Sequence, residues 1–65
     1  MRFIRLDRVK ELTGLGRSSI YKLMSEGAFP MSVPLTGQAV GWVSDEVDAW
    51  VLARIAERDA KAKKH

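Results

Sequence analysis

The side chains best suited to bind a ligand gather in the segment that begins at Arg17. In a helix turning about 100° per residue, Ser18, Lys22 and Ser25 fall opposite the apolar positions. Arg17 and Tyr21 flank this side. Small hydroxyls allow close approach, and the cationic and phenolic groups can donate hydrogen bonds to phosphates and base edges. The same pattern also fits an ordinary solvated helix face, and these residues alone leave both interpretations open.

Catalytic and metal chemistry find few candidates in this composition. The chain has no cysteine and one histidine, His65, which excludes a disulfide and a zinc site built on thiolate and imidazole ligands. A histidine-based catalytic pair would have to use this terminal residue. No apolar stretch has the length of a membrane span or a signal peptide. We therefore expect a cytoplasmic protein that is not an enzyme, without metal, cofactor or membrane partner.

Length and charge indicate one small domain with a basic surface. The chain has 65 residues, a formal charge of +3 and a sequence pI near 9.7. We expect a single domain over residues 3–60 and a flexible basic tail over 61–65. The positive excess lies in the first half and in the tail. This charge favours a polyanionic partner, but a merely solvated surface explains it equally well.

Two short helices joined by a tight turn are predicted first. Asp7 can cap a helix over residues 7–13, and Gly14 can end it in the left-handed conformation. A second helix is expected over about 17–26, with Gly16 as its N-cap. Its buried stripe has helical spacing and consists of Ile20, Leu23 and Met24. This arrangement fits a helix-turn-helix, and on the two helices alone an ordinary αα-hairpin fits as well.

A β-hairpin follows, because the apolar period changes to two after Pro30. Met31, Val33 and Leu35 alternate with polar residues and Pro34, which predicts a half-buried strand at a sheet edge. The turn is expected over 36–39 and the return strand over 40–43. Such a ribbon resembles the wing of winged helix-turn-helix proteins. Its tip, Thr36-Gly37-Gln38, could contact DNA or could belong to a ribbon that only covers the core.

A third helix completes the predicted order of elements. Ser44 is expected to cap it, and it should run to about Ala60. Its predicted apolar stripe consists of Val47, Trp50, Val51 and Ile55. Trp42 and Trp50 could stack on bases, but a domain this small needs both in its core. Leu52 lies off the stripe and is either an ordinary exposed leucine or a contact with a neighbouring protomer.

Several motifs together resemble the AlpA-type prophage regulators, a family related to MerR-like and excisionase-like winged helix-turn-helix proteins. The resemblance extends over about residues 3–58 and is carried by Phe3-Ile4-Arg5-Leu6, Val9, Leu12-Thr13-Gly14-Leu15, Arg17-Ser18-Ser19-Ile20-Tyr21-Lys22-Leu23, Gly27-Ala28-Phe29-Pro30, Val40-Gly41-Trp42 and Glu46-Val47-Asp48-Ala49-Trp50. It implies an α+β, mostly α fold. Two departures are Gly16, where the family usually has Ser, and Met31 with Gln38, where it often has basic residues.

The resemblance also implies a function and a set of site residues. The expected function is sequence-specific binding of double-stranded DNA for a prophage or integrative element, as an excisionase (recombination directionality factor), a transcriptional regulator of integrase-type genes, or both. By position, the resemblance places Arg17, Ser18, Tyr21 and Lys22 on the recognition helix and Thr36, Gly37 and Gln38 on the wing. To these expected DNA contacts we add Ser19 and Ser25 on the same helix and Arg5 and Arg8 at the DNA backbone.

One such domain reads only a few base pairs, so we expect help from other protein chains. Each correct pair contributes about 1–3 kcal/mol of discrimination, too little to select one genomic site. Because the sequence ends soon after its third helix, we expect cooperative head-to-tail protomers on direct repeats rather than a coiled-coil dimer. An integrase is a further expected partner. The alternative is a small phage-encoded adaptor that binds a protein through its uncharged hairpin.

Overall fold

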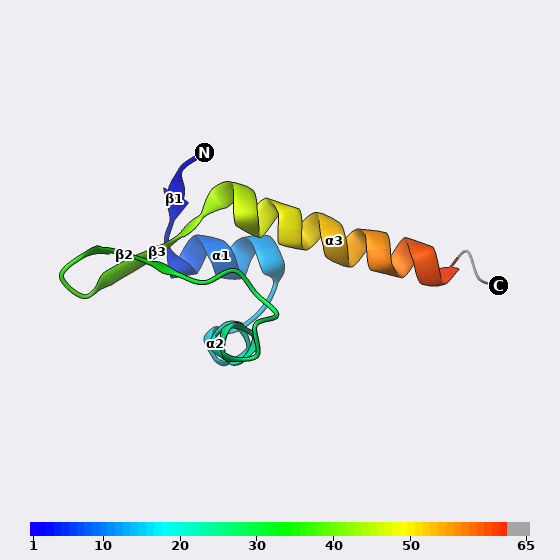
Figure 1. Cartoon of the computed structure of the whole chain (residues 1–65), viewed down its shortest axis with the longest axis horizontal. Coiled ribbons are helices and arrows are strands. Elements are labelled where there is room, and N and C mark those ends of the chain that lie inside the picture. Colours follow the sequence, from blue (N-terminus) through cyan, green and yellow to red (C-terminus); the bar gives the residue numbers. More distant parts are fainter. Residues whose placement is uncertain (63–65) are drawn as a thin grey trace.

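Three helices and a small antiparallel sheet make up the computed structural model, which describes residues 1–62 (Figure 1). The elements are, in order, β1 (Phe3–Ile4), α1 (Leu6–Thr13), α2 (Arg17–Ser25), β2 (Val33–Thr36), β3 (Ala39–Val43) and α3 (Ser44–Ala62). The fold is the predicted α+β, mostly helical, winged helix-turn-helix. Within the predicted tail, Lys63, Lys64 and His65 lie outside the described residues.

The turn between α1 and α2 is held by hydrogen bonds from both sides. Gly14 ends α1 with φ 73°, as predicted, and its N–H donates to the carbonyl of Lys10 at 2.8 Å. The hydroxyl of Thr13 donates to the carbonyl of Val9 at 2.8 Å and accepts from the N–H of Leu15 at 3.2 Å. This threonine therefore pairs with a carbonyl in the last turn of α1 and with an N–H in the loop between α1 and α2. Both bonds hold the loop in place and so determine where α2 begins.

The helix starts differ from the predictions at α1 and agree at α2. Helix α1 begins at Leu6, and Asp7 is not its N-cap but lies in the first turn. Extended Arg5 is the cap residue, with its carbonyl accepting from two amides of the first turn and no side-chain capping bond. The Asp7 carboxylate still suits the positive end of the helix dipole. Gly16 is the predicted N-cap of α2 and likewise has no side-chain cap.

The sheet has the strand order β1-β3-β2, with both pairs antiparallel. Strand β2 lies at an edge, as Pro34 predicts, but it starts only at Val33 and has an irregular register between Pro34 and Thr36. The predicted half-buried alternation is therefore wrong at two positions, because Met31 precedes the strand and Leu35 falls in the irregularity. Both side chains are exposed, at 61% and 37%. The short strand β1 was not predicted.

The core fills the space between the helices and β3. The buried apolar side chains are Ile4, Val9, Ile20, Met24, Phe29, Trp42 and Val47. Trp42 is completely buried, and its indole N–H has no hydrogen-bond partner within residues 1–62. Trp50 packs edge-on against Phe29, with ring centroids 4.9 Å apart, and donates to the carbonyl of Ala28 at 2.8 Å. Both tryptophans thus have the core role favoured above.

Helix α3 packs beside α1 and then continues past it, opposite the β2–β3 hairpin (Figure 1). The longest dimension is consequently 50 Å, against 24 and 19 Å for the others. Helix α3 begins at Ser44, whose hydroxyl accepts from the N–H of Arg2 at 3.1 Å. Ile55 is 42% exposed, so the predicted buried stripe ends at Val51. None of the helices within residues 1–62 combines the length and apolarity that a bilayer span requires.

Candidate nucleic-acid interface

Helix α2 divides into a buried and an exposed face as the spacing predicts. Ile20 and Met24 are buried, and Leu23 packs partly against them. All six predicted recognition residues are exposed, namely Arg17, Ser18, Ser19, Tyr21, Lys22 and Ser25. Glu26, the one acidic residue beside them, follows the end of the helix. The exposed face therefore presents two cations and three hydroxyl-bearing serines over two helical turns.

Tyr21 connects this face to the core. Its ring meets the buried Trp42 edge-on, with centroids 6.3 Å apart and an interplanar angle of 71°. The guanidinium of Arg17 lies 5.7 Å from the Tyr21 ring centroid on the outside. The aromatic ring is thus held between a rigid core side chain and a surface cation, an arrangement that favours one orientation of both.

Two other predicted residues are partly engaged within the protein. The Ser25 hydroxyl donates to the carbonyl of Lys22 at 2.7 Å, so its oxygen remains as an acceptor for an outside group. Arg8 lies 3.8 Å from Glu11 in an exposed ion pair one turn along α1. Such a pair is weak, and it leaves the arginine able to exchange its carboxylate for a phosphate.

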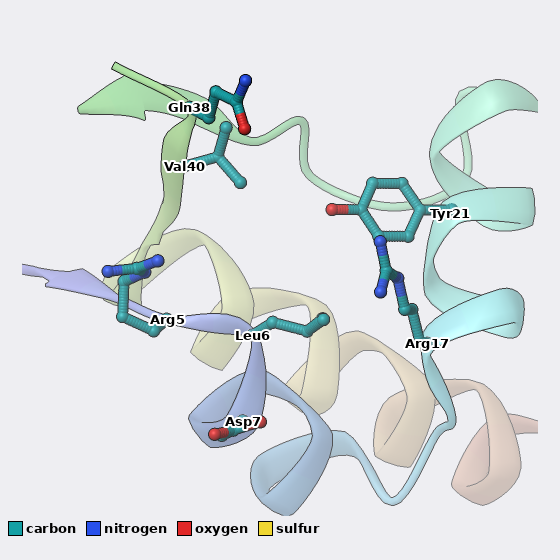
Figure 2. Close-up of a pocket in the computed structure, with 7 residues that line it drawn as sticks. All are labelled: Arg5, Leu6, Asp7, Arg17, Tyr21, Gln38 and Val40. Atoms are coloured by element: carbon teal, nitrogen blue, oxygen red, sulfur yellow. The ribbon is translucent and has the colours of Figure 1, made fainter. Parts of the chain in front are cut away.

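The structure brings the wing and α2 together around one cleft of about 460 Å³ (Figure 2). The wing contributes Gln38 and Val40, and α2 contributes Arg17 and Tyr21. The third wall comes from Arg5, Leu6 and Asp7 at the junction of β1 and α1. This cleft was not predictable from local sequence patterns, because its walls come from three segments and depend on the unpredicted β1. Thr36 and Gly37 are exposed at the wing tip but do not line it.

The wing tip is formed by a tight turn. Gly37 has φ 54° at the first turn position, where a left-handed residue matches the twist of the paired strands. Thr36 and Ala39 pair across the turn, which leaves Gln38 exposed at the end of the ribbon. The wing therefore presents hydrogen-bonding groups and no charge.

A tight helix-turn-helix with an exposed basic and hydroxyl-rich second helix, followed by a β-hairpin, defines the class of small winged helix-turn-helix domains. Within that class, residues 2–55 match the family described as Prophage CP4-57 regulatory protein (AlpA), and the chain belongs to this family. The family resemblance inferred from the motifs is thereby confirmed. The family description names a regulatory protein.

Two relatives are similar over most of this chain. An uncharacterized protein, ORF88, of Enterobacteria phage P4 is 49% identical over 57 residues, which cover 88% of this chain and 65% of the phage protein. The chain thus spans somewhat less than two thirds of that relative. The DNA-binding transcriptional activator AlpA of Escherichia coli (strain K12) is 32% identical over 60 residues, covering 83% of this chain and 86% of the activator.

Proposed function

We propose that this protein is a sequence-specific double-stranded DNA-binding regulator of a prophage or integrative element. It would act as an excisionase, as a transcriptional regulator of integrase-type genes, or as both, in the bacterial cytoplasm. The observation that carries the proposal is the exposed face of α2. Six side chains that can form hydrogen bonds lie on this face, and the buried residues Ile20 and Met24 lie on the other. Membership in a prophage regulatory family and similarity to a DNA-binding activator support it.

In this proposal α2 enters the major groove, where some of its outward side chains contact bases and others contact the DNA backbone. Lys22 reads guanine acceptors or a phosphate, while Ser18 and Ser19 allow the helix to approach the base edges. Tyr21 directs its hydroxyl to the backbone. The uncharged wing tip, Thr36 to Gln38, contacts the adjacent minor groove through hydrogen bonds, which contribute less there than an arginine would.

We also propose that neighbouring protomers bind cooperatively, head to tail, on direct repeats, and that an integrase is a further partner. Support comes from two exposed apolar side chains of α3, the helix that continues past α1 (Figure 1). Leu52 is 65% exposed and Ile55 42% exposed, three residues apart on the same side of the helix. An exposed apolar pair of this kind suits contact with a second protein chain better than contact with water.

A footprint of the purified protein on DNA flanking its gene and the neighbouring integrase gene, at two salt concentrations, tests the proposal. Evenly spaced protection at the attachment site would support the excisionase role and head-to-tail assembly. Protection confined to the integrase promoter would support transcriptional regulation, and a lone inverted repeat would contradict the assembly. The absence of protection at low salt would contradict DNA binding altogether.

The alternative function is a protein-binding adaptor, and the hairpin gives it one specific support. The apolar side chains of Met31, just before β2, and of Leu35, within β2, are exposed in a stretch, residues 27–43, that carries no charge. Salt dependence separates the two functions, because binding to phosphates should follow a log–log slope of about −0.9 for each phosphate neutralised. Contact through an uncharged ribbon should be nearly independent of salt.

A further inference from the structure

Five polar or charged side chains and two apolar ones, Leu6 and Val40, line the cleft between α2 and the wing. Figure 2 shows Tyr21 pointing its hydroxyl across the cleft, with the Arg17 guanidinium beside its ring. Arg5 lies on the far side, and the Gln38 amide stands at the wing edge. The cleft is therefore bordered by hydrogen-bond donors that come from three separate segments of the chain.

The two arginines of the cleft have no charged partner within residues 1–62. The ion pairs among the described residues join Arg8 to Glu11, Arg54 to Glu57 and Arg58 to Asp59, and none includes Arg5 or Arg17. Asp7 also lines the cleft, but it forms no ion pair with either arginine. Two guanidinium groups and one carboxylate line the cleft, so its net charge is positive and it attracts an anion.

The position of the cleft indicates which anion it takes. When one element lies in the major groove and the next in the adjacent minor groove, the sugar–phosphate strand that separates the grooves must pass between them. The cleft lies between α2 and the wing. We propose that a single backbone phosphate of DNA seats in this cleft, bound jointly by Arg5 and Arg17 with hydrogen bonds from Tyr21 and Gln38. This inference rests on the proposed DNA-binding function.

A shared phosphate gives Arg5 and Arg17 a positioning role. Guanidinium groups suit phosphate because their planar donors match its oxygens in pairs. Two guanidinium groups on one phosphate fix α2 and the β1–α1 junction relative to the same strand, and so fix the register in which Lys22 meets the bases. The β1 strand is required for this role, because the pairing of Ile4 with Trp42 of β3 fixes the position of the neighbouring Arg5.

Salt dependence of binding to a labelled mixed-sequence DNA duplex tests whether the phosphate is shared. If Arg5 and Arg17 hold the same phosphate, either alanine variant retains a cation there, and its log–log slope should stay close to the wild-type value. The double variant should lose about 0.9 from the slope, the value for one phosphate. Arg58→Ala is the matched control, because it removes the same charge on α3 away from the cleft and should leave the slope unchanged.

Other outcomes would overturn the inference. A loss of about 0.9 in each single variant and about 1.8 in the double variant would assign the arginines to two separate phosphates. A double variant with the wild-type slope would remove both from the DNA interface, whereas a wild-type protein that binds no duplex would contradict the proposed function instead. Inorganic phosphate could instead saturate the cleft, as observed at the arginine Nε–H signals, while the double variant keeps the wild-type slope. That result would mean that the cleft binds a free anion and not a DNA phosphate.

A charge-preserving double variant separates the loss of a phosphate contact from misfolding as the cause of weaker binding. Arg5→Lys with Arg17→Lys keeps the charge but not the paired donors, so the slope should persist while affinity falls several-fold. Both arginine side chains are exposed, and the backbone carbonyl of Arg5, which accepts bonds from α1, is retained in every variant. Unchanged affinity in this double lysine variant would refute the paired grip on the phosphate.

Discussion

Gly41 is the position where one added carbon should affect the sheet most directly. It lies in β3, the central strand, and pairs with Val33 of β2. A Cβ at this position would stand 3.0 Å from Cδ1 of Leu35 and 3.1 Å from the carbonyl oxygen of Ile4. Apolar carbons prefer separations of about 3.5–4.0 Å, so Gly41→Ala places its methyl group against both neighbouring strands.

The expected cost follows from what each neighbour can do. Leu35 is 37% exposed and can rotate away, but the Ile4 carbonyl belongs to the backbone of β1 and can move only with that strand. Overpacking of this kind destabilises by about 1–3 kcal/mol. Alanine restricts the unfolded chain more than glycine, which returns about 0.5–1 kcal/mol. The midpoints of these two ranges give a net loss of about 1 kcal/mol in the free energy of unfolding.

Circular dichroism during thermal and urea unfolding measures this loss. For a domain of this size each 1 kcal/mol corresponds to about 4–8 °C in Tm. A double-mutant cycle with Leu35→Ala separates the two clashes, because the second substitution should relieve only the contact with the leucine. Most of the loss should survive in the double variant. An unchanged or raised Tm in Gly41→Ala would refute the argument. If Leu35→Ala restored the full stability, the contact with the Ile4 carbonyl would not contribute to the loss.

Four further predictions concern α2 and the residues that support it. Gly16→Ser should stabilise the protein by a few tenths of a kcal/mol, because α2 lacks a side-chain cap, and a Tm shift measures it. Trp50→Phe removes the bond to the carbonyl of Ala28 and should lower the unfolding free energy by about 0.5–1.5 kcal/mol in urea. Lys22→Ala should weaken binding to the footprinted site by about 1–3 kcal/mol, and equal weakening on all sequences would mean a phosphate contact. Tyr21→Phe keeps the ring on Trp42, so affinity in a filter-binding assay should fall while Tm stays constant.

The helices were predictable because their signals are local. Gly14 and Gly16 bracket a turn whose glycine conformation follows from residue type, and the spacing of Ile20 and Met24 alone identifies the buried face of α2. Pro34 likewise placed β2 at a sheet edge, because proline cannot donate to a ladder. Each of these inferences needs only residues within one or two turns of each other.

The errors arise where distant segments decide the outcome. Strand β1 has two residues, too few for any period, and exists through pairing of Phe3 and Ile4 with β3. Ile55 has the spacing of a buried residue but is 42% exposed, because α3 continues past α1 and leaves the other elements among residues 1–62 (Figure 1). The cleft has the same origin, since Arg5 reaches the wing only through the β1–β3 pairing. Local pattern gives the faces of elements, and tertiary contact decides which faces meet.

Core and interface share residues in this small protein, and this sharing determines which measurements can identify a DNA contact. The buried ring of Trp42 contacts the ring of Tyr21 edge-on. Leu6 and Val40 both pack on the core and line the cleft. A substitution in any of them would alter the cleft and lower DNA affinity without removing a contact to DNA. Loss of affinity alone therefore does not separate a supporting residue from a binding one. The salt slope identifies the cations that neutralise phosphates, because it falls only when a phosphate loses every cation that neutralises it.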